Sequence, residues 1–80
     1  MNYTAVLWVN GIRQTMAETV YHDRDDALRR CFIWRCAYKD APFGPVQAEI
    51  HVNGGLYLTH HDIYREIGRR PELRRHPSVL

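Results

Sequence analysis

The chain has 80 residues, of which 45% are hydrophobic and 25% charged, and its net charge at pH 7 is +2. This length allows one domain with a small core, and this composition is typical of a globular protein rather than a disordered one. No apolar run approaches the roughly 20 residues that cross a bilayer, and residues 1–11 lack the pattern of a signal peptide. We therefore expect a cytoplasmic protein, of a bacterium or of an infected host cell, that makes no contact with a membrane.

The first part of the chain predicts a β-hairpin. Asn10 and Gly11 separate two β-rich runs and are typical of a two-residue type I′ turn. In that register Trp8 faces Arg13, which predicts a cross-strand cation–π contact on the outer face of the hairpin. The opposite face, which ends at Met16, is expected to face the core.

The next segment, residues 23–40, predicts an α-helix. Asp23 fits the N-cap, and two further aspartates follow in the first turn, where the helix dipole favours negative charge. Pro42, Gly44 and Pro45 are expected to end the helix. One helical face collects apolar side chains that we expect to pack on the sheet, namely Ala27, Leu28, Cys31, Trp34 and Tyr38.

A second hairpin and a short helix are predicted from residues 46–68. The run VQAEIHV alternates between apolar and polar side chains, as a half-buried strand does. We expect a three-residue loop at residues 53–55, because it keeps the aliphatic side chains of both strands on one face and leaves Tyr57 on the outer face. Thr59 and Asp62 match the N-cap and N3 positions of a helix, and Gly68 matches the position just after its end.

Together these elements predict an α+β fold in the order ββαββα. The two hairpins form one four-stranded antiparallel sheet, the long helix packs on one of its faces, and the short helix follows. We expect residues 1–68 to form this single domain and residues 69–80 to form a basic, mobile C-terminal tail. One further helical turn that starts at Pro71 is the alternative for this segment.

Positive charge is concentrated at the C-terminal end. Residues 1–61 carry six basic and six acidic side chains, whereas residues 62–80 carry five arginines and three acidic side chains. Ten of the eleven basic residues are arginines, whose planar group favours bidentate contacts with carboxylate or phosphate; a GC-rich genome would produce the same bias. This end of the chain could therefore contact phosphates, dock on an acidic protein surface, or remain a solvated tail.

The histidines and cysteines do not form a pattern typical of a metal or cofactor site. Zinc requires three or four converging ligands, and the neighbours His60 and His61 diverge. Cys31 and Cys36 point about 140° apart on one helix, so we expect free thiols in a reducing compartment. We expect no catalytic residue, metal or cofactor; a small ribonuclease that uses His51 or His61 is the third functional hypothesis.

Aromatic and arginine side chains predicted on the surface indicate where a partner would bind, because Trp, Tyr and Arg are enriched at interface hot spots. We expect a binding protein without enzymatic activity that occludes or remodels the surface of its partner. The candidate contact residues are Trp8, Arg13, Tyr57, Arg65, Arg69 and Arg70.

In its size, its hairpin–helix–hairpin layout and its lack of a catalytic signature, the chain resembles small phage-encoded anti-CRISPR proteins. The resemblance implies an inhibitor that binds a CRISPR effector, such as a type I surveillance complex, and obstructs recognition of target DNA or recruitment of the nuclease. The Arg-rich end would then fit an acidic protein patch or nucleic acid held in that ribonucleoprotein complex. The resemblance assigns no role to an individual residue.

The chain also resembles small α+β antitoxins and toxins, which implies a DNA- or RNA-binding regulator as the alternative function. Homodimerisation through the outer helix face or through a sheet edge is compatible with each of these hypotheses.

Overall fold

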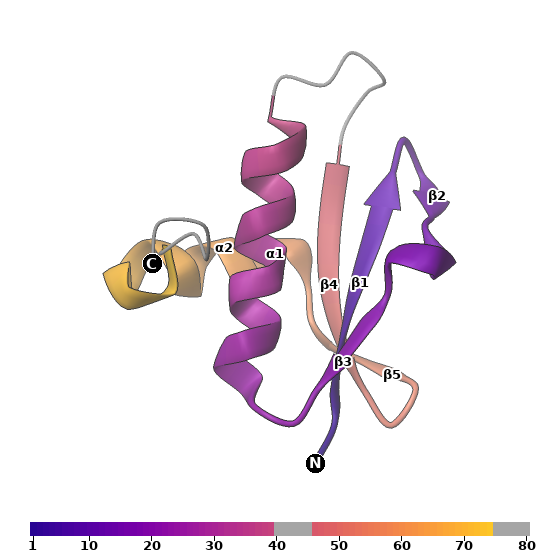
Figure 1. Cartoon of the computed structure of the whole chain (residues 1–80), viewed down its shortest axis with the longest axis horizontal. Coiled ribbons are helices and arrows are strands. Elements are labelled where there is room, and N and C mark those ends of the chain that lie inside the picture. The colour runs from indigo at the N-terminus through magenta and orange to yellow at the C-terminus, as the bar shows by residue number, and fades with distance from the viewer. Residues whose placement is uncertain (40–45, 75–80) are drawn as a thin grey trace.

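The computed structural model describes residues 1–39 and 46–74. An antiparallel sheet forms one layer and two α-helices form the other (Figure 1), which confirms the predicted α+β fold. None of the helices in the described residues is both long and apolar enough to cross a membrane. In chain order, with η for a 3-10 helix, the elements are β1 (Tyr3–Val9), β2 (Ile12–Arg13), η1 (Thr15–Ala17), β3 (Thr19–Tyr21), α1 (Arg24–Tyr38), β4 (Val46–Val52), β5 (Gly55–Leu58), α2 (His60–Arg69) and η2 (Pro71–Arg74).

β1 lies in the centre of the sheet. One edge of β1 pairs with β4, which pairs in turn with β5. The other edge pairs with β2 near the end of β1 and with β3 near its beginning. The sheet therefore has five strands rather than four, because the second strand of the predicted first hairpin is divided in two.

The turn of the first hairpin is the predicted one. Asn10 and Gly11 both have positive φ, 51° and 78°, as a type I′ turn requires. Trp8 faces Arg13 across the hairpin, so this part of the predicted register is confirmed.

The strand that returns from this turn differs from the prediction. η1 interrupts it and inserts three residues, so Ala5 pairs with Thr19 rather than with Met16. Met16, expected on the core face, is fully exposed, and Ala17 packs against the core in its place. An alternation of apolar and polar residues cannot reveal such an insertion, because a turn of a 3-10 helix and a strand can carry the same pattern.

The second hairpin has a shorter loop than predicted. Residues 53 and 54 both have positive φ and form a two-residue turn, where a three-residue loop was expected. A β-bulge follows, and the register shifts between Ile50 and His51. Leu58 therefore lies opposite Ile50 as predicted, but Leu56 lies opposite His51 and not on the core face.

The core lies between the two helices and one face of the sheet. α1 begins after its predicted N-cap, Asp23, whose side chain accepts a hydrogen bond from the backbone of Asp25. The predicted core face of α1 is confirmed, with Tyr38 partly buried at its end; the predicted helix break at residues 42–45 lies outside the described residues. The buried core residues are Ala5, Leu7, Ala27, Leu28, Cys31, Trp34, Ala48, Ile50, Ile63, Ile67 and Leu73.

The C-terminal boundary of the fold lies further along the chain than predicted. In the segment assigned to a basic tail, Arg69 ends α2, Arg70 caps it, and Pro71–Arg74 form η2, the turn that the sequence left open at Pro71. η2 buries Leu73 completely in the core. Burial of this one leucine holds η2 against the core even though arginines surround it in the sequence, because a whole aliphatic side chain is removed from water. The remainder of the predicted tail, residues 75–80, lies outside the described residues.

We expect Gly54 and Gly68 to respond in opposite ways to alanine. Gly54 has φ 79°, so Gly54→Ala strains the turn and should lower the free energy of unfolding by about 1 kcal/mol. Gly68 lies within α2 rather than after its end, and no atom outside its own helix lies within 4 Å of an added Cβ. Gly68→Ala should therefore raise the free energy of unfolding by up to about 1 kcal/mol. Thermal unfolding followed by circular dichroism measures both, and changes of the same sign would contradict the prediction.

Candidate interaction surfaces

One face of the sheet carries no helix. Both α1 and α2 lie on the same side of the sheet (Figure 1), and the strand register places a second set of side chains on the opposite side. We name this side the open face. Its residues are Thr4, Val6, Trp8, Arg13, Val20, Gln47, Glu49, His51 and Leu56.

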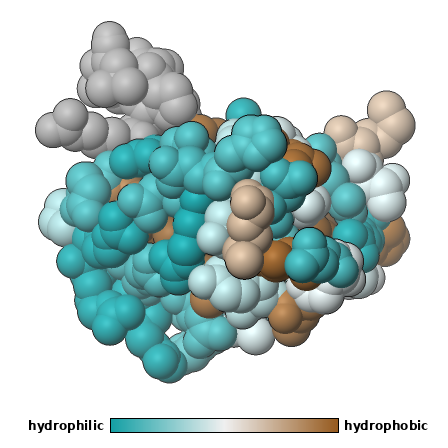
Figure 2. Space-filling view, turned by 90° about the horizontal axis from the view of Figure 1, so that it is seen from below, coloured by the Kyte–Doolittle hydropathy of each residue, from teal (hydrophilic) through white to brown (hydrophobic). Residues whose placement is uncertain are grey.

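A row of four side chains crosses the open face, in the order Val20, Thr4, His51, Leu56. The two ends of the row are apolar and exposed, with 58% of Val20 and 55% of Leu56 accessible to solvent. Val6 in the next row is fully buried even though no helix covers it, so neighbouring side chains close over it. On the face seen in Figure 2, hydrophobic residues gather on the side formed by the strands, while the side formed by the helices is mostly hydrophilic.

A hydrogen-bonded group fixes the centre of the open face. Oε1 of Glu49 accepts a hydrogen bond from Nε1 of Trp8 at 2.9 Å and lies 3.0 Å from Nε2 of His51. Partial burial favours the neutral carboxyl, but the hydrogen bonds from His51 and Trp8 outweigh it and lower the pKa of Glu49. Arg13 forms an ion pair with Glu18 in place of the predicted cation–π contact with Trp8. Two predicted contact residues thus lie on this face, each held by a carboxylate.

Tyr57 lies on the helix side of the sheet, and its predicted position on the outer face is wrong. Nε of Arg24 donates a hydrogen bond to its hydroxyl at 3.1 Å, and its ring centroid lies 5.8 Å from that of Tyr3. The bulge in β5 explains the reversal, because one extra residue turns the next side chain to the other face. His51 faces the open side and His61 lies on α2, so the groups considered for a histidine-dependent ribonuclease do not converge.

Arg70 belongs to a network of ion pairs between the helices. Its guanidinium lies 2.7 Å from Asp25, 3.1 Å from Glu66 and 2.9 Å from Glu72. Arg24 donates two further hydrogen bonds to Glu66. The hydrogen bonds from Arg24 and then from Arg70 lower the pKa of Glu66, although partial burial opposes them. Arg70, a predicted contact residue, is therefore engaged within the chain, where it ties α1 to α2 and η2.

Arg65 and Arg69 are exposed on the outer side of α2. With His61 they repeat every four residues, so the three basic side chains share one edge of the helix. This edge, which we name the α2 ridge, lies opposite the buried Ile63 and Ile67. No carboxylate among residues 1–39 and 46–74 forms an ion pair with either arginine, although the charge of Arg65 helps to lower the pKa of Asp62.

His60 has a structural role that its neighbour in the sequence does not share. Its Nδ1 accepts a hydrogen bond of 3.1 Å from the backbone N–H of Ala48, at a point on β4 that β5 does not reach. Its ring packs edge-on against Tyr64, with 4.6 Å between centroids. Burial, and then the charge of Arg35, lower the pKa of His60, which keeps this acceptor neutral. The imidazole of His60 thus accepts the hydrogen bond that a neighbouring strand would otherwise accept from β4.

The two thiols are free, as predicted, and differ in environment. Cys36 is exposed, whereas Cys31 is buried in the core, where burial raises its pKa to about 12. In the part of the chain that the structure describes, no group of three or more His, Cys, Asp or Glu side chains is placed to hold a metal ion.

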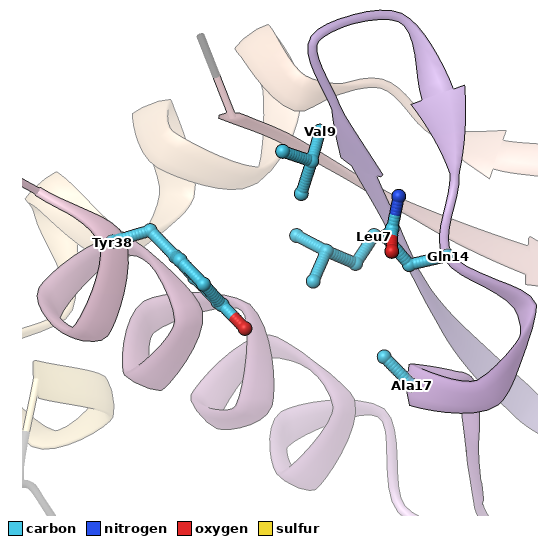
Figure 3. A pocket seen from close by; sticks show the side chains of 5 residues that line it. All are labelled: Leu7, Val9, Gln14, Ala17 and Tyr38. Atoms are coloured by element: carbon cyan, nitrogen blue, oxygen red, sulfur yellow. The ribbon is translucent and has the colours of Figure 1, made fainter. Parts of the chain in front are cut away.

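A small pocket opens between α1, β1 and η1 (Figure 3). Its volume is about 300 Å³, and its lining consists of Leu7, Val9, Gln14, Ala17 and Tyr38. The lining is apolar apart from one amide and one phenol, and it contains no carboxylate, imidazole or thiol. Such a lining offers contact area but no acid–base or nucleophilic pair, so it does not indicate a catalytic site.

Comparison of the chain with known protein families, with curated proteins and with solved structures finds no match.

Proposed function

We propose that this protein is a non-enzymatic binding protein and that the open face contacts a partner protein. One observation carries the proposal. The open face is a sheet surface without a helix, with two exposed aliphatic residues, Val20 and Leu56, at the ends of one row, and Glu49 beside that row is hydrogen-bonded to both His51 and Trp8. Aliphatic side chains exposed on an uncovered sheet face offer a partner apolar surface to remove from water.

The charges of the open face favour an apolar partner surface over a charged one. Arg13 is paired with Glu18, and Glu49 is paired with Trp8 and His51, so the face presents little free charge. The sheet edges offer less to a partner, because β2 and β3 are very short and β5 is bulged, features that disfavour pairing with another strand. We therefore propose an uncharged, apolar surface of another protein as the occupant.

In its narrower form, the proposal is an inhibitor carried by a phage and acting in the cytoplasm of the host cell. The resemblance to anti-CRISPR proteins in size and layout supports this form, and it points to a CRISPR surveillance complex as the partner. By occupying a surface of that complex, the protein would block recognition of target DNA or recruitment of the nuclease.

The test is a tagged pull-down from bacterial lysate that contains CRISPR effectors, with and without nuclease treatment. We expect a defined protein complex that survives nuclease and that Val20→Glu with Leu56→Glu abolishes, because a buried unpaired carboxylate is costly in an apolar contact. Met16→Glu is the matched control, since Met16 is fully exposed and lies outside the open face. Retention of the complex by the double variant, or equal loss in the control, would overturn the assignment of the face. A surviving complex without a CRISPR effector would overturn only the narrower form.

The alternative function, a small DNA- or RNA-binding regulator, is favoured by a different observation, the free arginines of α2. It predicts recovery of nucleic acid and its usual companions, lost on nuclease treatment.

A further inference from the structure

Among the described residues, every acidic side chain has a partner within the chain, whereas some arginines have none. Every carboxylate in residues 1–39 and 46–74 has a partner within the chain: Glu18, Asp23, Asp25, Asp26, Glu49, Asp62, Glu66 and Glu72. Most of the arginines in these ranges are engaged by a carboxylate, a tyrosine hydroxyl or an aromatic ring. The exceptions are Arg65, Arg69 and Arg74, all near the C-terminal end of the described chain.

We infer that the α2 ridge binds the phosphate backbone of a nucleic acid through Arg65 and Arg69. Because the two arginines are one helical turn apart, their backbones lie about 6 Å from each other along the helix axis. Guanidinium groups form strong, bidentate hydrogen bonds with phosphate oxygens. The inference does not depend on the protein contact proposed for the open face.

α2 holds these two arginines in place. The capping box of Thr59 and Asp62 fixes the start of the helix, and Ile63 and Ile67 anchor its opposite side in the core. Glu66 is held by Arg24 from α1, which prevents α2 from rotating. The backbone that carries the two arginines is therefore already ordered, so binding has to order only their side chains.

The surroundings of the ridge favour a nucleic acid over an acidic protein. A protein interface depends on an apolar or aromatic anchor at its centre. None of the large hydrophobic residues exposed in the described chain belongs to α2. They lie before α1 or in β5, and they are Met1, Ile12, Met16, Val20, Leu56 and Tyr57. A ridge that offers charge alone meets the requirement of a phosphate backbone, whose binding is electrostatic and independent of sequence.

Fluorescence anisotropy with a labelled mixed-sequence 20-mer, as single-stranded DNA and as RNA, tests the inference between 25 and 200 mM salt. We expect the full-length protein to bind both with an affinity that falls steeply as salt rises. Arg65→Gln with Arg69→Gln should lower the affinity at least about tenfold at 50 mM salt and reduce the slope of log K against log salt by about 1.4, roughly 0.7 for each lost phosphate contact on a single strand.

The matched control is Arg13→Gln with Arg29→Gln, which removes the same charge from two arginines already paired with Glu18 and Asp26. We expect this variant to keep most of the affinity and the slope. Equal losses in the two arginine variants would overturn the inference, because net charge alone would then explain binding. Binding of poly-glutamate, but not of the 20-mers, would also overturn it and assign the ridge to an acidic protein.

Discussion

Leu73→Ala should lower the free energy of unfolding by about 2–5 kcal/mol, the range for a buried leucine replaced by alanine. Leu73 is completely buried against the core although four arginines lie within four residues of it in the sequence. In a domain of this size each kcal/mol shifts the melting temperature by roughly 4–8 °C, so we expect a loss of more than about 8 °C. The effect is large because small domains have little stability to lose.

Chemical denaturation and thermal unfolding of the same samples measure this effect. Met16→Ala is the control, since its side chain is fully exposed and its loss should change stability by less than about 0.5 kcal/mol. If Leu73→Ala were as mild as Met16→Ala, η2 would not be part of the cooperative fold, and the basic tail would begin where the charge pattern placed it.

Glu66→Gln should be the second most damaging of the substitutions that we propose. The carboxylate accepts two hydrogen bonds from Arg24 and lies 3.1 Å from Arg70, and its side chain is only 15% exposed. Without this negative charge the two guanidinium groups face each other without a shared partner. After allowance for solvent screening at a site near the surface, we expect a loss of about 1–2 kcal/mol.

This loss should depend on pH in a defined direction. The pKa of Glu66 is lower in the folded protein than in the unfolded chain, because Arg24 and Arg70 stabilise its charged form. Its contribution is therefore fully present above the unfolded pKa, about 4.3, and is lost as pH falls through the lower folded pKa. The stability difference between the native chain and Glu66→Gln should be constant from pH 8 to 5.5 and should shrink below pH 4.5.

Denaturant unfolding at several pH values checks this profile. Glu18→Gln serves as the comparison, because the exposed Arg13–Glu18 pair should contribute little at any pH. A difference for Glu66→Gln that does not shrink in acid would show that shape, rather than charge, explains the loss.

Sequence patterns that span only a few residues, such as helix caps and tight turns, predicted the local structure correctly. Asp23 and the Thr59–Asp62 pair stand at helix starts, as predicted, since a cap satisfies backbone groups next to it in sequence. The type I′ turn at Asn10 and Gly11 is equally local. These features require no knowledge of the remainder of the chain.

The strand register beyond each turn was not predictable in the same way. η1 after Gln14 and the bulge beside Ile50 each change the register of a strand, and a shift of one residue reverses the face of every side chain beyond it. For that reason Tyr57 was placed on the wrong face, and the exposed Val20 and Leu56 were not recognised as ends of one row.

The sequence also could not predict which arginines form ion pairs within the chain. The sequence alone does not distinguish Arg65, Arg69 and Arg70. Arg70 forms ion pairs with three carboxylates, two of which come from α1 and η2, while the other two arginines form none within the described residues. Which arginine is free depends on how α1, α2 and η2 pack together, and no local pattern contains that information.

The central position of β1 has a consequence for how the chain folds during synthesis. β1 is made before β4, and Val9 pairs with Val46 and Tyr3 with Val52. A central strand of the sheet therefore leaves the ribosome long before the strand that pairs with it. Until then the edge of β1 that pairs with β4 lies open, because β2 and β3 pair with the other edge and α1 packs on one face. Long-range pairing of this kind slows folding and prolongs exposure to aggregation. Faster synthesis of residues 10–45 should therefore raise the yield of native protein more than faster synthesis of the segment that follows β4.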